Sequence, residues 1–265
     1  MKVLAVHPDL IVVVSRFWQT TCTAVRAGEE GFVIDSPVYP DELEALSGVF
    51  EQAGFPVSGL LATHGDWDHL LGRIAFPEAS LGVGESTARR LAAEPGQAQR
   101  ELREFDEEQY IDDRRPLALA GIQALPVPGR LSLGAGDHEL ELHPADGHTA
   151  DGTAFFIPWL EVLACGDYLS PVEIPWISPG GSVEKYLATL ERLRLLVERA
   201  HTIVPGHGRP LDRAEATRVL DEDIAYLEAL RTAGLDAKLP AGRRTGAQRR
   251  IHAENVQRTS TLPPT

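Results

Sequence analysis

Cysteine is nearly absent from this 265-residue chain, which contains only Cys22 and Cys165. Two cysteines do not make a disulfide framework, and neither lies in a Cys-x-x-Cys pair of the kind that binds zinc. Cys165 ends the apolar run 160–165, where a cysteine usually serves as a small buried residue. Neither cysteine is therefore a candidate metal ligand.

Basic residues are also few, with 25 Lys and Arg against 39 Asp and Glu and a formal net charge of −14. Phosphate contacts need clustered Lys and Arg, so this balance argues against an extended nucleic-acid surface and against docking on anionic membranes. The Arg-rich segment from Arg243 to Arg258 is at most a local patch. We expect a small-molecule substrate, no nucleic-acid or membrane partner, and leave a homodimer open.

Long apolar runs are missing as well, and no stretch of about 18 apolar residues could span a membrane. His7, Pro8 and Asp9 interrupt the apolar N-terminus, which does not have the pattern of a signal peptide. The 43% hydrophobic and 24% charged content is typical of a globular protein. A cytoplasmic location is therefore expected.

The first third of the chain alternates short apolar runs with turn residues and predicts strands at 10–15, 22–26 and 31–35. Leu43, Leu46 and Phe50 recur at helical spacing and predict a helix from Asp41, its expected N-cap, to Ala53. The apolar residues 57–62 then predict a buried strand. This order is typical of α/β folds whose sites lie at the carboxyl ends of strands.

The rest of the chain predicts one continuous domain over residues 1–235, followed by a C-terminal tail at 236–265. Residues 87–115 are rich in Glu, Arg and Gln and predict a mostly exposed helical insertion or lid. The later predicted elements are short strands within 122–142, a strand pair at 155–157 and 162–164, a helix at 182–200 with Ser182 as N-cap, a strand at 202–204 and a helix at 213–233.

A dense cluster of potential metal ligands directly follows the predicted strand at 57–62. Within six residues the chain carries His64, Asp66, Asp68 and His69. A strand cannot present such neighbours to one point, because alternate residues face opposite sides, whereas a loop or first helical turn can. Imidazole and carboxylate together suit zinc, iron or manganese rather than an oxygen-only cation such as calcium.

Three further candidate ligands follow other predicted strands: His148, Asp167 and His207. Each is preceded by glycine, which lets the backbone approach a crowded centre closely. Singly each is a weak signal, but together with the first cluster they form an ordered set of seven.

With this set the sequence resembles the metallo-β-lactamase-fold superfamily of metal-dependent hydrolases over residues 10 to 210. The family signature is His-x-His-x-Asp-His, then Gly-His, a bridging Asp and a final Gly-His; here the first motif is His-x-Asp-x-Asp-His. The resemblance implies an α+β fold, a four-layer αββα sandwich. It also implies that one metal is bound by His64, Asp66 and His148, the other by Asp68, His69 and His207, with Asp167 as the bridge.

The resemblance further implies two divalent ions, zinc first, and a metal-bound, bridging hydroxide as nucleophile. Asp68 would also hold or relay the proton of that water, which makes it the candidate catalytic residue. Asp35, which closes a predicted strand, would orient the ligand loop, although a plain turn aspartate is an equal reading.

Asp66 departs from the family pattern, because most of these hydrolases carry histidine at this position. A carboxylate is shorter, charged and harder than imidazole, which shifts preference from zinc toward manganese or iron. Its shorter reach would also leave the first site weak, bound through water, or empty. The flavodiiron branch of the superfamily carries glutamate there.

Three aromatic residues near the ligands, Trp67, Tyr168 and Trp176, are candidates for substrate contact, with Tyr168 as a donor to a developing oxyanion. Packing of the loops against the core is the competing reading for each. The first functional hypothesis is hydrolysis of an ester, thioester, lactone or related acyl bond in a small molecule. The alternatives are a non-haem iron oxidoreductase and a metal-binding protein without catalysis.

Overall fold

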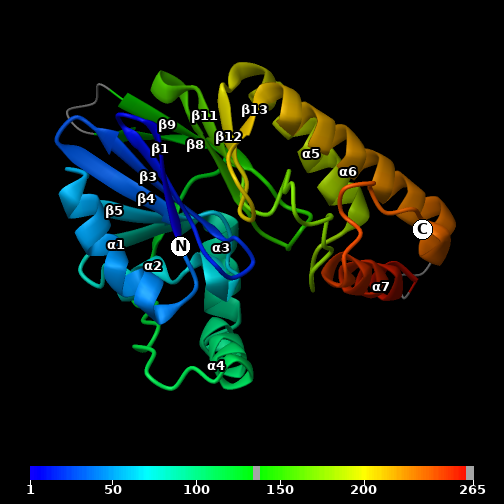
Figure 1. The fold of residues 1–265 in the computed structure, drawn as a ribbon, viewed down its shortest axis with the longest axis horizontal. Helices are drawn as coiled ribbons and strands as arrows, with labels where there is room; N and C mark the ends of the chain where they lie inside the picture. Colours follow the sequence, from blue (N-terminus) through cyan, green and yellow to red (C-terminus); the bar gives the residue numbers. More distant parts are fainter. Residues whose placement is uncertain (134–137, 261–265) are drawn as a thin grey trace.

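The computed structural model describes residues 1–133 and 138–260. In these residues the strands form two mixed sheets that pack face to face, with helices on both outer sides (Figure 1). This arrangement confirms the predicted αββα sandwich.

The first sheet has the strand order β1-β2-β3-β4-β5-β6-β7. The first four strands are antiparallel neighbours, whereas β4 to β7 run parallel to one another. Their bounds are β1 Lys2–His7, β2 Leu10–Val14, β3 Thr21–Ala27, β4 Glu30–Asp35, β5 Gly59–Ala62, β6 Ser80–Gly84 and β7 Gln123–Leu125.

The second sheet has the order β13-β12-β11-β10-β9-β8, in which only β11 and β12 of the described strands are parallel neighbours. Its strands are β8 Gly129–Leu133, β9 His138–Pro144, β10 Thr153–Ile157, β11 Val162–Ala164, β12 Thr202–Val204 and β13 Leu211–Asp212.

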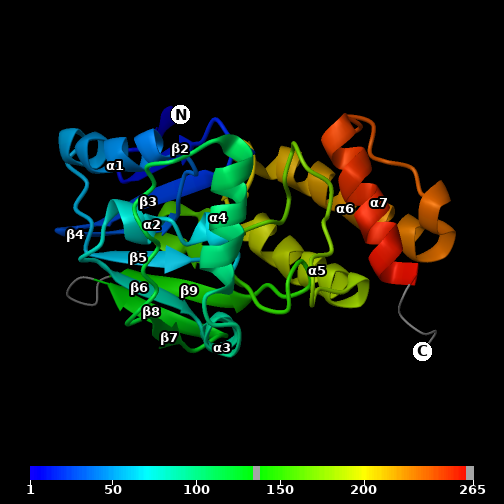
Figure 2. The same ribbon diagram turned by 90° about the horizontal axis from the view of Figure 1, so that it is seen from below.

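The helices divide between the two outer faces (Figures 1 and 2). Those that pack on the first sheet are α1 Pro40–Gln52, α2 Gly72–Ala75, α3 Glu85–Ala93 and α4 Gln97–Gln109. Those on the second sheet are α5 Val183–Arg199 and α6 Arg213–Ala233, and α7 Gly246–Ser260 packs beside α6. None of the described helices combines the length and apolar character that a membrane span requires.

The buried apolar side chains form a layer between the sheets and a layer under each set of helices. Strand β2 shows how the sequence produces this: Leu10, Val12 and Val14 face the other sheet, while Ile11 and Val13 face the helices. Alternate residues of a strand point to opposite faces, so a strand buried on both sides is continuously apolar. Each such side chain contributes about 1.5–3 kcal/mol when fully buried.

Most predicted elements are present, with two corrections. Helix α1 begins at Pro40 after the N-cap Tyr39, so Asp41 lies in the first turn and is not the cap. Proline suits the first helical position because its missing N–H has no partner there anyway. Strand β1 was not predicted.

The segment at 87–115 is largely helical and mostly exposed, as predicted, and a few apolar residues anchor it. Helix α4 buries Ala98, Leu102 and Phe105 against the first sheet's helical layer. The predicted boundary at residue 235 stays a prediction, although residues 246–260 form a packed helix.

Candidate metal centre

The candidate ligands lie where strand ends from both sheets meet. His64 follows the carboxyl end of β5, Asp167 follows β11 and His207 follows β12, while His148 lies in the loop between β9 and β10. Because β11 and β12 are parallel, their carboxyl ends lie at one edge. Asp68 and His69 belong to a single 3₁₀ turn, Trp67–His69, which is one of the two local forms, a loop or a helical turn, that the sequence predicted.

Two of the four histidines are fixed by backbone carbonyls from distant loops. His148 Nδ1 donates to the carbonyl oxygen of Trp176 at 2.8 Å, and His207 Nδ1 donates to that of Trp18 at 3.1 Å. Since a carbonyl only accepts, each Nδ1 carries a proton, and Nε2 is left as the atom that can bind a metal ion.

The other two histidines are fixed by a pair of polar residues at the ends of β4 and β5. His69 Nδ1 lies 3.0 Å from Asp35 Oδ2, and His64 Nδ1 lies 3.1 Å from Thr63 Oγ1. The Thr63 hydroxyl donates to Asp35 Oδ2 at 2.9 Å, so it accepts from His64. Asp35 also accepts the Thr63 backbone N–H. These contacts give Asp35 the orienting role proposed for it.

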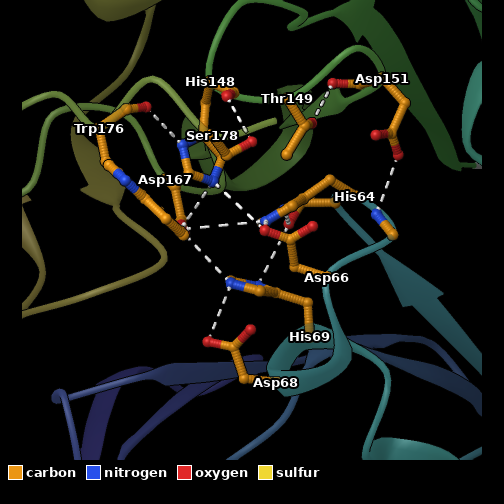
Figure 3. A network of polar contacts seen from close by, with 12 residues as sticks. His64, Asp66, Asp68, His69, His148, Thr149, Asp151, Asp167, Trp176 and Ser178 are labelled. Carbon is orange, nitrogen blue, oxygen red and sulfur yellow. Dashed lines mark hydrogen bonds and ion pairs between the residues drawn. The ribbon is translucent and has the colours of Figure 1, made fainter. Parts of the chain in front are cut away.

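The freed Nε2 atoms converge with carboxylates on a first position. His64, His148 and Asp167 each offer a ligand atom within 4.8 Å of the others. Asp66 Oδ2 lies 3.7 Å from both His64 Nε2 and His148 Nε2, and Asp167 Oδ2 lies 3.3 Å from His148 Nε2. Figure 3 shows these side chains pointing toward one another.

A second position lies on the other side of Asp167. Asp68, His69 and His207 form the second group. Asp68 Oδ2 lies 3.6 Å from His69 Nε2 and 3.7 Å from His207 Nε2. Asp167 reaches the same nitrogens at 3.1 and 3.2 Å. Asp167 is thus shared by both positions, as expected of a bridge.

These residues fit a pair of metal ions. Four ligand atoms held tetrahedrally at about 2.0–2.2 Å from zinc lie roughly 3.3–3.6 Å apart, close to the separations observed here. In the described part of the chain, Nε2 of His64, His69 and His148 and Oδ1 of Asp167 are buried and make no hydrogen bond, although the His69 and Asp167 atoms form a close ion pair. Buried polar atoms are seldom left unpaired without a reason, and a bound cation supplies one.

The electrostatics of the metal-free centre favour added positive charge. Burial opposes ionisation of Asp167, but the charges of His207 and His69 hold the pKa of Asp167 well below its usual range. Burial likewise lowers the pKa of His207, yet the negative charges of Asp167 and Glu173 raise it to about 10. The carboxylates therefore favour protons on His69, His148 and His207 where metal ions would otherwise lie.

Two of the glycines that precede ligands are required by close packing. A Cβ at Gly206 would overlap Asp167 Oδ1. Gly147 has a φ of 129°, and a Cβ there would overlap the backbone of Tyr186 at the start of α5. Both positions bear out the close backbone approach predicted for these glycines.

A cavity of about 800 Å³ opens over the centre, and two of the three predicted aromatic residues line it. Trp67 is buried against Phe105, and Trp176 lies over His148 with ring centroids 5.5 Å apart. Trp18, which the sequence did not single out, is 46% exposed at the mouth and lies 5.9 Å from Trp67.

Tyr168 does not line this cavity. Its hydroxyl accepts the His148 backbone N–H at 3.0 Å and donates to the Ala145 carbonyl at 3.1 Å, and the ring is 2% exposed. We therefore withdraw the predicted oxyanion contact, because the phenol is committed to holding the loop that carries His148.

Two charged residues of the cavity were missed at the sequence level. Arg90 of α3 lies 2.8 Å from Asp66 Oδ1, and Glu173 lines the cavity near His207. Burial raises the pKa of Glu173. Arg90 lies in a charged helical segment and Glu173 in a loop. In neither place does the spacing of residues distinguish a functional side chain from an ordinary solvated one.

Comparisons with known proteins agree with this geometry. A metallo-β-lactamase family protein from Thermus thermophilus has 20% identity and a TM-score of 0.68, with 98% of this chain and 96% of that chain covered. A metallo-β-lactamase from Pontibacter korlensis has 18% identity and a TM-score of 0.61, with 83% and 97% covered.

A stereoselective inverting sec-alkylsulfatase from Pseudomonas sp. has 13% identity and a TM-score of 0.70, covering 97% of this chain and 49% of that one. These likenesses show the fold alone. No curated protein matches the sequence. The family model of the metallo-beta-lactamase superfamily matches residues 15–207, which include all seven candidate ligands, and the chain therefore belongs to that superfamily.

Proposed function

We propose that this protein is a hydrolase that uses two divalent metal ions to cleave an ester, thioester, lactone or related acyl bond in a small molecule. The observation that carries the proposal is the convergence of four imidazole Nε2 atoms on a shared carboxylate, with every Nδ1 already occupied. Such preset ligands hold an ion without reorganisation. Zinc is the first expectation, and a cytoplasmic location remains part of the proposal.

When bound, the ions would lower the pKa of a bound water toward neutrality and polarise the carbonyl under attack. The chain's own residues position the other participants. Asp68 lines the cavity between His69 and His207, so its carboxylate can hold the proton that the attacking water loses. Trp67, Trp176 and Trp18 would hold the apolar part of a substrate beside the centre.

The donor set also supports a second candidate function. Asp66, Asp68 and Asp167 add three carboxylates to four imidazoles, and hard oxygen donors suit iron and manganese as well as zinc. An iron oxidoreductase on the same fold is therefore the alternative, and a metal-binding protein without turnover is the third possibility.

Hydrolysis is tested with metal-depleted protein reconstituted with zinc, manganese or ferrous iron and assayed against a panel of esters, thioesters and lactones. We expect turnover that depends on added metal and falls at least about a hundredfold in Asp68→Asn, which keeps the side-chain shape but removes the base. Lys238→Ala, an exposed change beyond the centre, is the matched control and should not alter turnover.

The proposal is contradicted if the zinc- and manganese-loaded protein turns over no member of the panel. Consumption of oxygen or a sulfur compound by the iron-loaded form alone would favour the oxidoreductase. Turnover that is unchanged in Asp68→Asn would remove the assigned role of Asp68.

A further inference from the structure

Asp66, which stands where most of these hydrolases carry histidine, is paired with an arginine that is not part of the family signature. Arg90 Nη1 lies 2.8 Å from Asp66 Oδ1 and also 2.8 Å from Asp151 Oδ1. Its side chain is 19% exposed, and Asp151 is 1% exposed. Arg90 Nε also lies 3.5 Å from Glu94 Oε2. The guanidinium is therefore committed to carboxylates of its own chain, which leaves it poorly suited to anchor an anionic substrate.

Asp66 divides its two oxygens between this guanidinium and the metal position. Oδ1 accepts from Arg90, whereas Oδ2 lies 3.7 Å from both His64 Nε2 and His148 Nε2. A carboxylate on a short side chain can rotate, and an ion pair on one oxygen fixes the direction of the other. Arg90 thus aims Asp66 at the position that histidine occupies in the usual motif.

Asp151 connects the same arginine to the backbone of the ligand loop. Its Oδ2 accepts the Gly65 N–H at 2.9 Å, directly between His64 and Asp66 (Figure 3). Asp151 itself lies three residues after His148. Arg90 therefore joins the two loops that carry the ligands of the first site.

The charge balance points the same way. Without Arg90, the half-buried carboxylate of Asp66 and the buried carboxylate of Asp151 would lie beside a centre that already holds Asp68 and Asp167. Like charges in a buried site destabilise one another strongly, so the guanidinium offsets one of them. In the described residues, Arg90 makes no ion pair or hydrogen bond with Asp68, His69 or His207 of the second site.

We infer that Arg90, together with Asp151, is a positioning device that makes Asp66 a working ligand of the first metal site in place of histidine. This inference rests on the proposed two-metal function and adds a residue-level reason for the variant motif. It predicts a selective effect: loss of Arg90 weakens metal binding at the first site and leaves metal binding at the second site unchanged.

The test is zinc titration of metal-depleted protein in competition with a chromophoric chelator, with the absorption spectrum of the cobalt-loaded protein as a second readout. For Arg90→Met we expect one dissociation constant to weaken by about 10–100-fold, the usual effect of losing a residue that orients a ligand, while the other is unchanged. Arg90→Lys retains the charge but cannot bridge both carboxylates, so it should lie between wild type and Arg90→Met.

The matched control is Arg89→Met on the same helix, whose side chain is 75% exposed and pairs only loosely with Glu85 at 4.0 Å. It should bind zinc as wild type does. Asp66→His is the converse test. In that background the effect of Arg90→Met should be clearly smaller than in wild type, because an imidazole needs no guanidinium to aim it and only the contact of Arg90 with Asp151 is still lost.

Unchanged zinc constants in Arg90→Met, an equal loss at both sites, or a full Arg90→Met effect in the Asp66→His background would each overturn the inference. Wild-type protein that binds two zinc ions yet hydrolyses no acyl compound would contradict the proposed function while leaving this result standing.

Discussion

At the scale of single residues, two histidine ligands of the centre are oriented by backbone carbonyl groups that accept their hydrogen bonds and lie far away in the sequence. His207 is oriented by the carbonyl of Trp18 and His148 by that of Trp176. Trp18 has a φ of 50°, a conformation that few residues other than glycine adopt without cost. The hairpin loop between β2 and β3 thus bears local strain at the point where its carbonyl meets His207.

The protonation of His207 predicts how metal binding depends on pH. Its pKa of about 10 in the metal-free protein means that zinc must displace a proton at neutral pH. Zinc affinity should therefore rise by about tenfold per pH unit below pH 10 for each proton displaced. Calorimetric titration in buffers of different ionisation enthalpy measures that release, and pH-independent affinity would contradict the assignment.

The raised pKa of His207 also predicts how the stability of the metal-free protein changes with pH. The folded pKa of His207 lies above its ordinary value of about 6.5, so its stabilising contribution to the metal-free protein is complete below pH 6.5. That contribution is lost as the pH rises toward 10. Thermal unfolding of the metal-free protein across this range should show it, and His201→Ala, at an exposed position, should leave the profile unchanged.

Gly206 provides a prediction about packing at the bridge. In Gly206→Ala the new methyl group would displace Asp167 Oδ1, so both metal sites should weaken by about 10–100-fold while the protein still folds. Gly48→Ala in α1 is the matched control, because nothing lies near its Cβ position. It should stabilise the helix by about 0.5–1 kcal/mol and leave zinc binding unaltered.

At the scale of elements, helix α7 supports the loop that orients His148. Buried Asn255 accepts the Ile177 N–H at 2.8 Å and donates to the Pro175 carbonyl at 2.7 Å. These bonds lie on either side of Trp176, whose carbonyl receives His148 Nδ1. The C-terminal residues are thereby connected to the metal centre through a single loop.

Replacement of Asn255 tests that connection. In Asn255→Ala the Ile177 N–H and the Pro175 carbonyl lose their partner in a buried place, which should cost about 2–4 kcal/mol of unfolding free energy. Zinc affinity at the first site should also fall. Arg249→Ala on the exposed face of α7 should change stability by less than about 0.5 kcal/mol. If Asn255→Ala is destabilised but binds zinc as tightly as wild type, helix α7 does not support the metal centre.

At the scale of the whole molecule, much of the fold could be predicted because its information is local. The continuous apolar run of β2, the helical spacing in α5 and the ordered ligand set depend on neighbouring residues, and the ligands converge as the strand order requires. Arg90, Trp18 and Asn255 could not be found this way. Each acts through a partner more than 20 residues away, so only the packed fold brings the two together.

Metal removal should affect the entire domain, since the ligands join both sheets. A site occupied at free metal 1,000 times its Kd stabilises the folded state by about 4 kcal/mol. For a domain of this size that corresponds to about 8–16 °C in Tm. Differential scanning calorimetry with and without a chelator measures the shift, and an unchanged Tm would show that no metal is bound in the folded state.

Elemental analysis of protein purified without added metal or chelator tests the central claim most directly. The two ligand groups around Asp167 predict about two equivalents of zinc or manganese per chain. The role inferred for Arg90 also predicts a lower zinc content for Arg90→Met than for wild type, and an unchanged content for Arg89→Met. A wild-type protein that holds no metal, even after reconstitution with zinc, manganese or iron, would contradict the account of the centre and of its function.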